Sequence, residues 1–130
     1  MKHISQPPGS NLCGQACVAM IAGVTLEKSI AVFGKRGETE TREVIAALRK
    51  LGIKCGGKLQ RMKKGVTPTP CCIMVLHYDG VPIRHWHWIV YYGGLYYDPA
   101  ESIGIAYKAG VRITSYLSVY LAAQAEEDGQ

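Results

Sequence analysis

No apolar run in this chain of 130 residues approaches the roughly 20 residues that a helix needs to cross a bilayer. Residues 1–8 contain one lysine but no apolar stretch after it, and so lack the pattern of a secretory signal peptide. Hydrophobic residues make up 48% of the chain and charged residues 19%, which is the balance of a globular protein with a buried core. We therefore expect a cytoplasmic protein that has no membrane partner.

Cysteine pairs with the C-x-x-C spacing of zinc sites are also absent from the sequence. Two of the five cysteines are adjacent, and adjacent side chains on a strand point to opposite faces of a sheet. An odd number of cysteines without repeated spacing indicates free thiols in the cytosol rather than a disulfide framework. We expect neither a structural metal nor a cofactor. The five are Cys13, Cys17, Cys55, Cys71 and Cys72.

Acidic residues are lacking between residues 54 and 64, where five of the fifteen basic residues lie, although the net charge of +5 is modest. This segment contains no aromatic residue that could stack on a base, which argues against a nucleic-acid partner. A basic run can contact an acidic partner, but a solvated loop is the simpler explanation and the one that we favour. The five are Lys54, Lys58, Arg61, Lys63 and Lys64.

Helical patterns come first along the chain. The apolar residues from Cys13 to Ala22 predict one helix, and a stripe of apolar residues over 40–51, followed by Gly52, predicts another. Between them, Thr25 is a good N-cap for a short helix that continues to Phe33.

Strand patterns dominate the second half. The apolar run over 71–78 predicts a buried strand, and Gly93-Gly94 predicts the two-residue turn of a hairpin. We expect a single α+β domain over residues 1–122 and a polar, frayed tail over 123–130. The expected strands cover 52–55, 71–78, 86–92, 95–98, 103–107 and 111–113, and a short closing helix is expected over 114–122.

Cys13 lies where the first predicted helix begins. Unpaired backbone N–H groups and the positive end of the helix dipole at this position favour a thiolate, which is the nucleophilic form of cysteine. Gly14 directly after it leaves room for the backbone of a substrate. A cysteine near a helix start is by itself more often a small core residue. Cys17, one turn later, is either a resolving thiol or, as we favour, a core residue.

The hairpin register selects a base for this thiol. If Gly93-Gly94 forms the turn, His87 and Asp98 are diagonal neighbours on one face of the sheet, within reach of their side chains. His85 competes with His87 if the register slips by two residues. The pairs expected from this turn are Tyr92–Leu95, Tyr91–Tyr96, Val90–Tyr97 and Ile89–Asp98.

A thiol, an imidazole and a carboxylate that orients the imidazole form a set for nucleophilic catalysis. Cys13, His87 and Asp98 each have an ordinary structural explanation when taken alone, but their co-occurrence in this order and register favours catalysis. Tyr91 and Tyr96, on the His87 face, are candidate walls of a substrate cleft. The opposite face carries residues expected to pack beneath the sheet or against a partner: Trp86, Trp88, Val90 and Tyr92.

In these residues the chain resembles the papain-like cysteine peptidases, most closely the bacteriocin-processing (double-glycine leader) peptidase family and its stand-alone relatives. The resemblance covers about residues 4–110 and combines a glutamine before a C-G-x-A-C helix start, a histidine before an aromatic and β-branched residues, and an Asp-Pro after a hairpin. A helix that ends in Leu-Gly lies between them. The matching segments are Gln6, Cys13–Cys17, Thr41–Ile53, His87–Val90 and Asp98–Ala100.

The resemblance implies a papain-like fold, in which an N-terminal helical half carries the nucleophile and packs on a C-terminal antiparallel sheet. It implies Cys13 as the nucleophile, His87 as the general base and Asp98 as the group that orients His87. Gln6 would donate its side-chain amide to an oxyanion hole shared with the backbone N–H of Cys13. Gln6 lies seven residues before Cys13, one more than is usual in the family, so Gln15 and Asn11 stay open as alternative donors.

The resemblance thus predicts a cysteine peptidase that hydrolyses a peptide bond in a peptide or protein substrate through a thioester intermediate. Two alternatives remain open. The same triad could transfer the acyl group to an amine or a thiol, or the domain could be a binder or inhibitor that keeps the fold without the chemistry. A complete triad argues against the binder, which has no need of all three residues.

Overall fold

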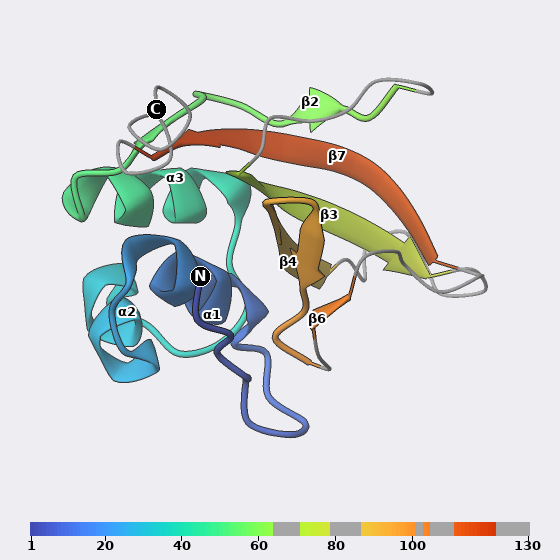
Figure 1. Cartoon of the computed structure of the whole chain (residues 1–130). Coiled ribbons are helices and arrows are strands. Elements are labelled where there is room, and N and C mark those ends of the chain that lie inside the picture. Colours follow the sequence, from blue (N-terminus) through green and yellow to red (C-terminus); the bar gives the residue numbers. More distant parts are fainter. Residues whose placement is uncertain (64–70, 79–86, 101–102, 105–110, 122–130) are drawn as a thin grey trace.

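The computed structural model of the chain describes residues 1–63, 71–78, 87–100, 103–104 and 111–121, and it confirms a mixed α+β architecture. The described part has three helices followed by an antiparallel sheet (Figure 1). Figure 1 shows the helices gathered on one side of the sheet, with the long strands β3 and β7 beside each other. The helices are α1 (Cys13–Ala22), α2 (Leu26–Phe33) and α3 (Thr41–Lys50).

Local signals determine where the second and third helices begin. The Thr25 side chain accepts a hydrogen bond from the backbone N–H of Lys28 at 3.1 Å, as expected for its N-cap position. At the start of α3, Glu40 and Glu43 form a reciprocal capping box that pairs two otherwise unpaired N–H groups. The predicted bounds of all three helices are therefore confirmed to within one residue at each end.

The described strands form one sheet in the order β1-β7-β3-β4-β5-β6, and β2 also pairs with β7. Every pairing is antiparallel. The strands are β1 (Lys54–Cys55), β2 (Gln60–Arg61), β3 (Cys71–Tyr78), β4 (His87–Tyr92), β5 (Leu95–Tyr97), β6 (Ile103–Gly104) and β7 (Val111–Tyr120). The expected turn after residue 78, residues 105–107 and the tail over 123–130 lie outside the described residues.

The expectation of a helix over 114–122 is wrong, because β7 continues as a strand to Tyr120. Leu117 and Val119 are buried and lie two residues apart, which is the period of a strand. β7 lies between β3 on one edge and β1 and β2 on the other, so its backbone groups are paired on both sides. These long-range pairings outweigh the weak local preference of the segment.

The hairpin of β4 and β5 has the predicted register for its three ladder pairs. Both turn glycines have positive φ, 59° for Gly93 and 81° for Gly94, as a two-residue hairpin turn of this kind requires. The ladder between these strands ends at Val90 and Tyr97, so the expected Ile89–Asp98 pair is not part of it. The confirmed pairs are Tyr92–Leu95, Tyr91–Tyr96 and Val90–Tyr97.

The main core lies between the helices and one face of the sheet. Trp88 and Val90 of β4 pack there with buried residues of α1 and α3, while Ile89 faces a second cluster on the other side. Taken alone, none of the described helices has the length and apolar character to cross a membrane; α1 and α2 pass that test only as a pair bent by 112°. The sheet residues of the main core are Trp88, Val90, Tyr97, Leu117 and Val119.

Candidate active site

Cys13 is the first residue of α1 and carries a half-buried free thiol. The preceding N-cap is Leu12, whose side chain cannot accept a hydrogen bond, and α1 has no side-chain cap. The first N–H groups of a helix have no intrahelical partner, and they make this end of the helix electropositive. The predicted place of the thiol at the start of the helix is therefore confirmed.

His87 and Asp98 form a short hydrogen bond, with His87 Nε2 at 2.7 Å from Asp98 Oδ1. Both side chains are largely removed from solvent, with 13% of His87 and 4% of Asp98 exposed. The same carboxylate oxygen accepts the backbone N–H of Ala100 at 2.8 Å, which fixes the carboxylate directly after β5. Because Nε2 is bonded to Asp98, Nδ1 is the ring nitrogen that remains for the thiol.

The pKa of His87 is raised by Cys13 as well as by Asp98. Burial lowers this pKa, but side-chain hydrogen bonds with Asp98 and Cys13, together with their negative charges, outweigh burial and raise it from 6.5 to about 9. The structure thus brings together the three residues predicted to form a triad, with His87 in the middle. At neutral pH the ring is an imidazolium that lies between two groups able to carry negative charge.

We expect His87 to make the stability of the protein depend on pH. Its pKa rises from 6.5 to about 9 on folding, so the folded state binds this proton more tightly. The stabilisation is on the order of 3 kcal/mol, fully present below about pH 6.5 and lost as the pH rises through about 9. Urea unfolding of the parent and of His87→Gln measures it, and their difference in unfolding free energy should shrink over this interval. A constant difference would contradict the expectation.

Gln6 lies beside Asp98 because the N-terminal segment pairs with the chain after β5. The backbone N–H of Gln6 donates to the carbonyl of Pro99 at 2.8 Å, and the His3 ring donates from Nε2 to the Asp98 carbonyl at 2.7 Å. The side-chain amide of Gln6 donates to the Ser10 carbonyl at 2.7 Å, three residues before Cys13. An amide nitrogen has two N–H groups, so this bond leaves Gln6 a second donor for an oxyanion.

A tight turn explains how Gln6 reaches the helix start despite its longer spacing. The N–H of Ser10 donates to the Pro7 carbonyl at 3.0 Å, and Gly9 has a φ of 74°. A glycine with positive φ after a proline is typical of a type II turn. The turn folds the additional residue out of the path between Gln6 and Cys13.

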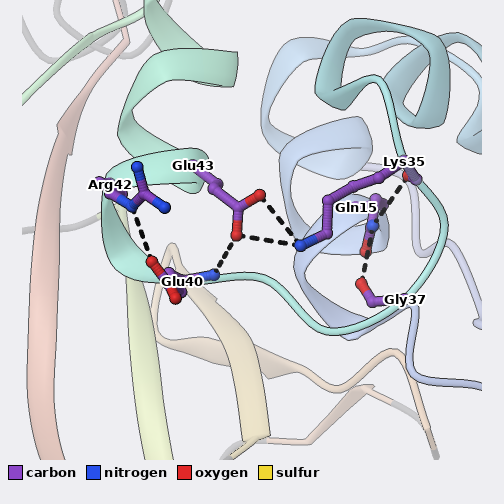
Figure 2. Close-up of polar contacts among 6 residues, drawn as sticks. All are labelled: Gln15, Lys35, Gly37, Glu40, Arg42 and Glu43. Carbon is purple, nitrogen blue, oxygen red and sulfur yellow. Dashed lines mark hydrogen bonds and ion pairs between the residues drawn. The ribbon is translucent and has the colours of Figure 1, made fainter.

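Gln15 is not available as an alternative oxyanion donor. Its side chain is fully buried, and its amide donates to the carbonyls of Gly37 at 2.9 Å and Lys35 at 3.3 Å (Figure 2). Asn11, the other alternative, is exposed. The contacts of Gln6 with Ser10 and Pro99 therefore make it the better candidate of the three.

Gly14 allows Thr39 to pack closely against the first turn of α1. A Cβ atom built on Gly14 would clash with Oγ1 of Thr39, so the space beside this glycine is filled by Thr39. Gly14 is itself buried. The missing side chain makes room for a residue of the α2–α3 loop, and the expected role of Gly14 in admitting the backbone of a substrate stays a prediction.

Tyr91 and Tyr96 pack on each other across the hairpin, with their ring centroids 5.0 Å apart. They also pack against the fully buried Ile89 in the second cluster, on the predicted face of β4. Their role as walls of a substrate cleft stays a prediction. The competing His85, and Trp86, lie outside the described residues.

Cys17 is fully buried in the main core, which supports its interpretation as a core residue. Burial raises the pKa of its thiol well above the usual value, and the charges of Cys13 and Asp98 add to this effect. A thiol that stays protonated is a poor nucleophile. Across the described ranges, no group of three histidine, cysteine or acidic residues is arranged to hold a metal ion.

Sequence reasoning missed two residues near the site, His3 and Thr39. His3 contacts the carbonyl of Asp98, which lies 95 residues later in the chain, and no local sequence pattern predicts such a contact. Thr39 lies in a loop without regular structure, where only the neighbouring Cys13-Gly14 pair could have indicated that something must pack beside the glycine.

Comparisons with known proteins add no family to this description. A scan against models of protein families finds no match, and a search of curated proteins finds none either. The geometry of the site is therefore the basis on which a function can be inferred.

Proposed function

We propose that this protein is a cysteine peptidase of papain-like fold that hydrolyses peptide bonds through Cys13, His87 and Asp98. We also propose that it acts in the cytoplasm, where free thiols stay reduced. The single observation that carries the proposal is the position of His87, whose Nε2 is hydrogen bonded to Asp98 and whose pKa is raised by both Asp98 and Cys13.

The chemistry follows from the charges of these groups. The Cys13 thiolate attacks the carbonyl carbon of the scissile bond, and the negative charge moves to the carbonyl oxygen. The backbone N–H of Cys13 and the second N–H of Gln6 are the donors proposed for this oxygen. The His87 imidazolium then gives its proton to the leaving amine, and the C–N bond breaks to leave a thioester on Cys13.

Water completes the reaction. Neutral His87 takes a proton from the water molecule that attacks the thioester, the carboxylic acid product leaves, and the thiolate–imidazolium pair is restored. Asp98 keeps its charge throughout and holds the ring by its bond to Nε2. The hydrogen bond from Ala100 keeps Asp98 in place during both steps.

A library of peptides that covers all dipeptide junctions tests the proposal. We expect the parent protein to produce fragments with new termini, each pair heavier than its precursor by one water, and Cys13→Ala protein to produce none. Products that carry an added amine or thiol would indicate transfer instead of hydrolysis. Cleavage that persists in folded Cys13→Ala protein would contradict a thiol peptidase.

A further inference from the structure

The first turn of α1 is held from outside the helix by the side chain of Gln15. This residue is fully buried, and its amide donates to two carbonyls of the α2–α3 loop, those of Lys35 and Gly37 (Figure 2). Gln15 lies two residues after Cys13 in the same helical turn. The two bonds therefore connect the turn that carries the thiol to a segment 20 to 22 residues away.

The loop that accepts these bonds is fixed at its far end. Glu43 accepts the backbone N–H of Glu40 at 2.8 Å in the capping box, and it also pairs with Lys35 at 3.0 Å (Figure 2). Arg42 adds an exposed ion pair to Glu40 at 2.7 Å, which contributes little by itself. Bonds at residues 35, 37 and 40 leave the loop little freedom to move relative to α1 and α3.

Thr39 is the residue of this loop that packs on Gly14, the neighbour of Cys13. It is 5% exposed and packs directly on Gly14, with no room for a Cβ atom between them. Its hydroxyl oxygen is buried and has no hydrogen-bond partner among the described residues. Packing, and not its hydroxyl, therefore accounts for the place of Thr39.

The first turn needs such support because it lacks a cap. Leu12 provides no side-chain acceptor, and helix ends without one fray readily. A catalytic group has to be held within about 0.5 Å of its productive position, which a fraying turn does not achieve.

We propose that Gln15 is a positioning residue, which holds Cys13 against His87 by fixing the loop of residues 35–39 on the first turn of α1. This inference rests on the proposed function, in which the Cys13–His87 pair is catalytic. Gln15 touches neither substrate nor reacting atoms; it acts through Thr39 and Gly14.

The test compares Gln15→Met with Ser29→Ala. Methionine is of similar length and helix propensity but cannot donate to the loop. Ser29 is an equally buried control, because its hydroxyl donates at 2.8 Å to the backbone carbonyl of the same Gln15 from α2, without touching the loop. The measurement is the rate at which iodoacetamide alkylates Cys13 near pH 6, followed by fragmentation mass spectrometry, with Cys55 as the internal reference.

We expect Gln15→Met to slow the alkylation of Cys13 by about tenfold to a hundredfold, while Ser29→Ala stays close to the parent. The rate of alkylation of Cys13 in Gln15→Met should approach that of the internal reference Cys55. Thr39→Ala, which removes two of the three side-chain atoms beside Gly14 but keeps both bonds of Gln15, should slow the reaction too. If Gln15→Met does not fold, Thr39→Ala is the variant that tests whether the loop positions Cys13.

Parent-like reactivity in folded Gln15→Met, or equal slowing in Gln15→Met and Ser29→Ala, would overturn the positioning role. Both outcomes leave the proposed function intact. A parent protein whose Cys13 reacts no faster than Cys55 would instead overturn the proposed function, and the positioning role with it.

Discussion

Replacing His87 by alanine is expected to lower kcat for peptide hydrolysis by about 10⁶-fold, as the loss of a triad histidine does in serine peptidases. The substitution removes the proton donor for the leaving amine and the cation that pairs with the thiolate. Alkylation of Cys13 near pH 6 should slow at the same time, because the imidazolium no longer stabilises the negative sulfur. Hydrolysis and alkylation rates of the same preparation check both effects.

Asp98→Asn is the graded control for this prediction. An asparagine oxygen can still accept from His87 Nε2 and from the Ala100 N–H, so the ring keeps its orientation. The negative charge is lost, however, and the pKa of His87 should fall from about 9. We expect a smaller loss of kcat than in His87→Ala, with the decline of activity at high pH moved to lower pH. A His87→Ala protein with more activity than Asp98→Asn would contradict the assigned roles.

Replacing Trp88 by alanine is expected to lower the free energy of unfolding by about 3 to 5 kcal/mol. Trp88 is 1% exposed and belongs to the core that joins β4 to α1 and α3. Its removal leaves a cavity between the half of the domain that carries Cys13 and the strand that begins with His87. The midpoint and slope of urea unfolding measure the loss.

Trp88→Phe is the matched variant for the packing argument. The indole Nε1 has no hydrogen-bond partner within the described part of the chain, so phenylalanine loses volume but no polar contact. We expect a clearly smaller loss of stability than for alanine. Equal losses in the two variants would show that the size of the cavity is not what matters at this position.

Most of the fold could be predicted because its signals are local. Thr25 and Gly52 mark helix ends, and the pair Gly93-Gly94 determines the hairpin register on which the choice of His87 and Asp98 depends. The second half of β7 could not be predicted in this way. Residues 114–120 mix serines and tyrosines with Leu117 and Val119 and carry no strong local strand signal. They form a strand because they pair on both edges, with β3 on one side and β1 and β2 on the other, and that environment exists only in the complete sheet.

The part of the site that depends on local signals could also be predicted. The pairing of His87 with Asp98 follows from the turn, whereas the supporting contacts join residues that are far apart in the chain. Gln15 reaches Gly37, and Gln6 reaches Pro99, without any periodic pattern at either end. The contact of Gly14 with Thr39, 25 residues later, could not be predicted either.

The strand order has a consequence for when the candidate site can assemble during synthesis. β7 is the last of the described elements to leave the ribosome, yet it lies between β1 and β3 and connects the segment after α3 to the rest of the sheet. Contacts of such long range form late and slowly in folding. Cys13 is therefore synthesised early, but β7, which pairs with β3, is added only near the end of the described residues. If the proposed function holds, a nascent chain would be unable to cut its own unfolded remainder until this sheet has formed.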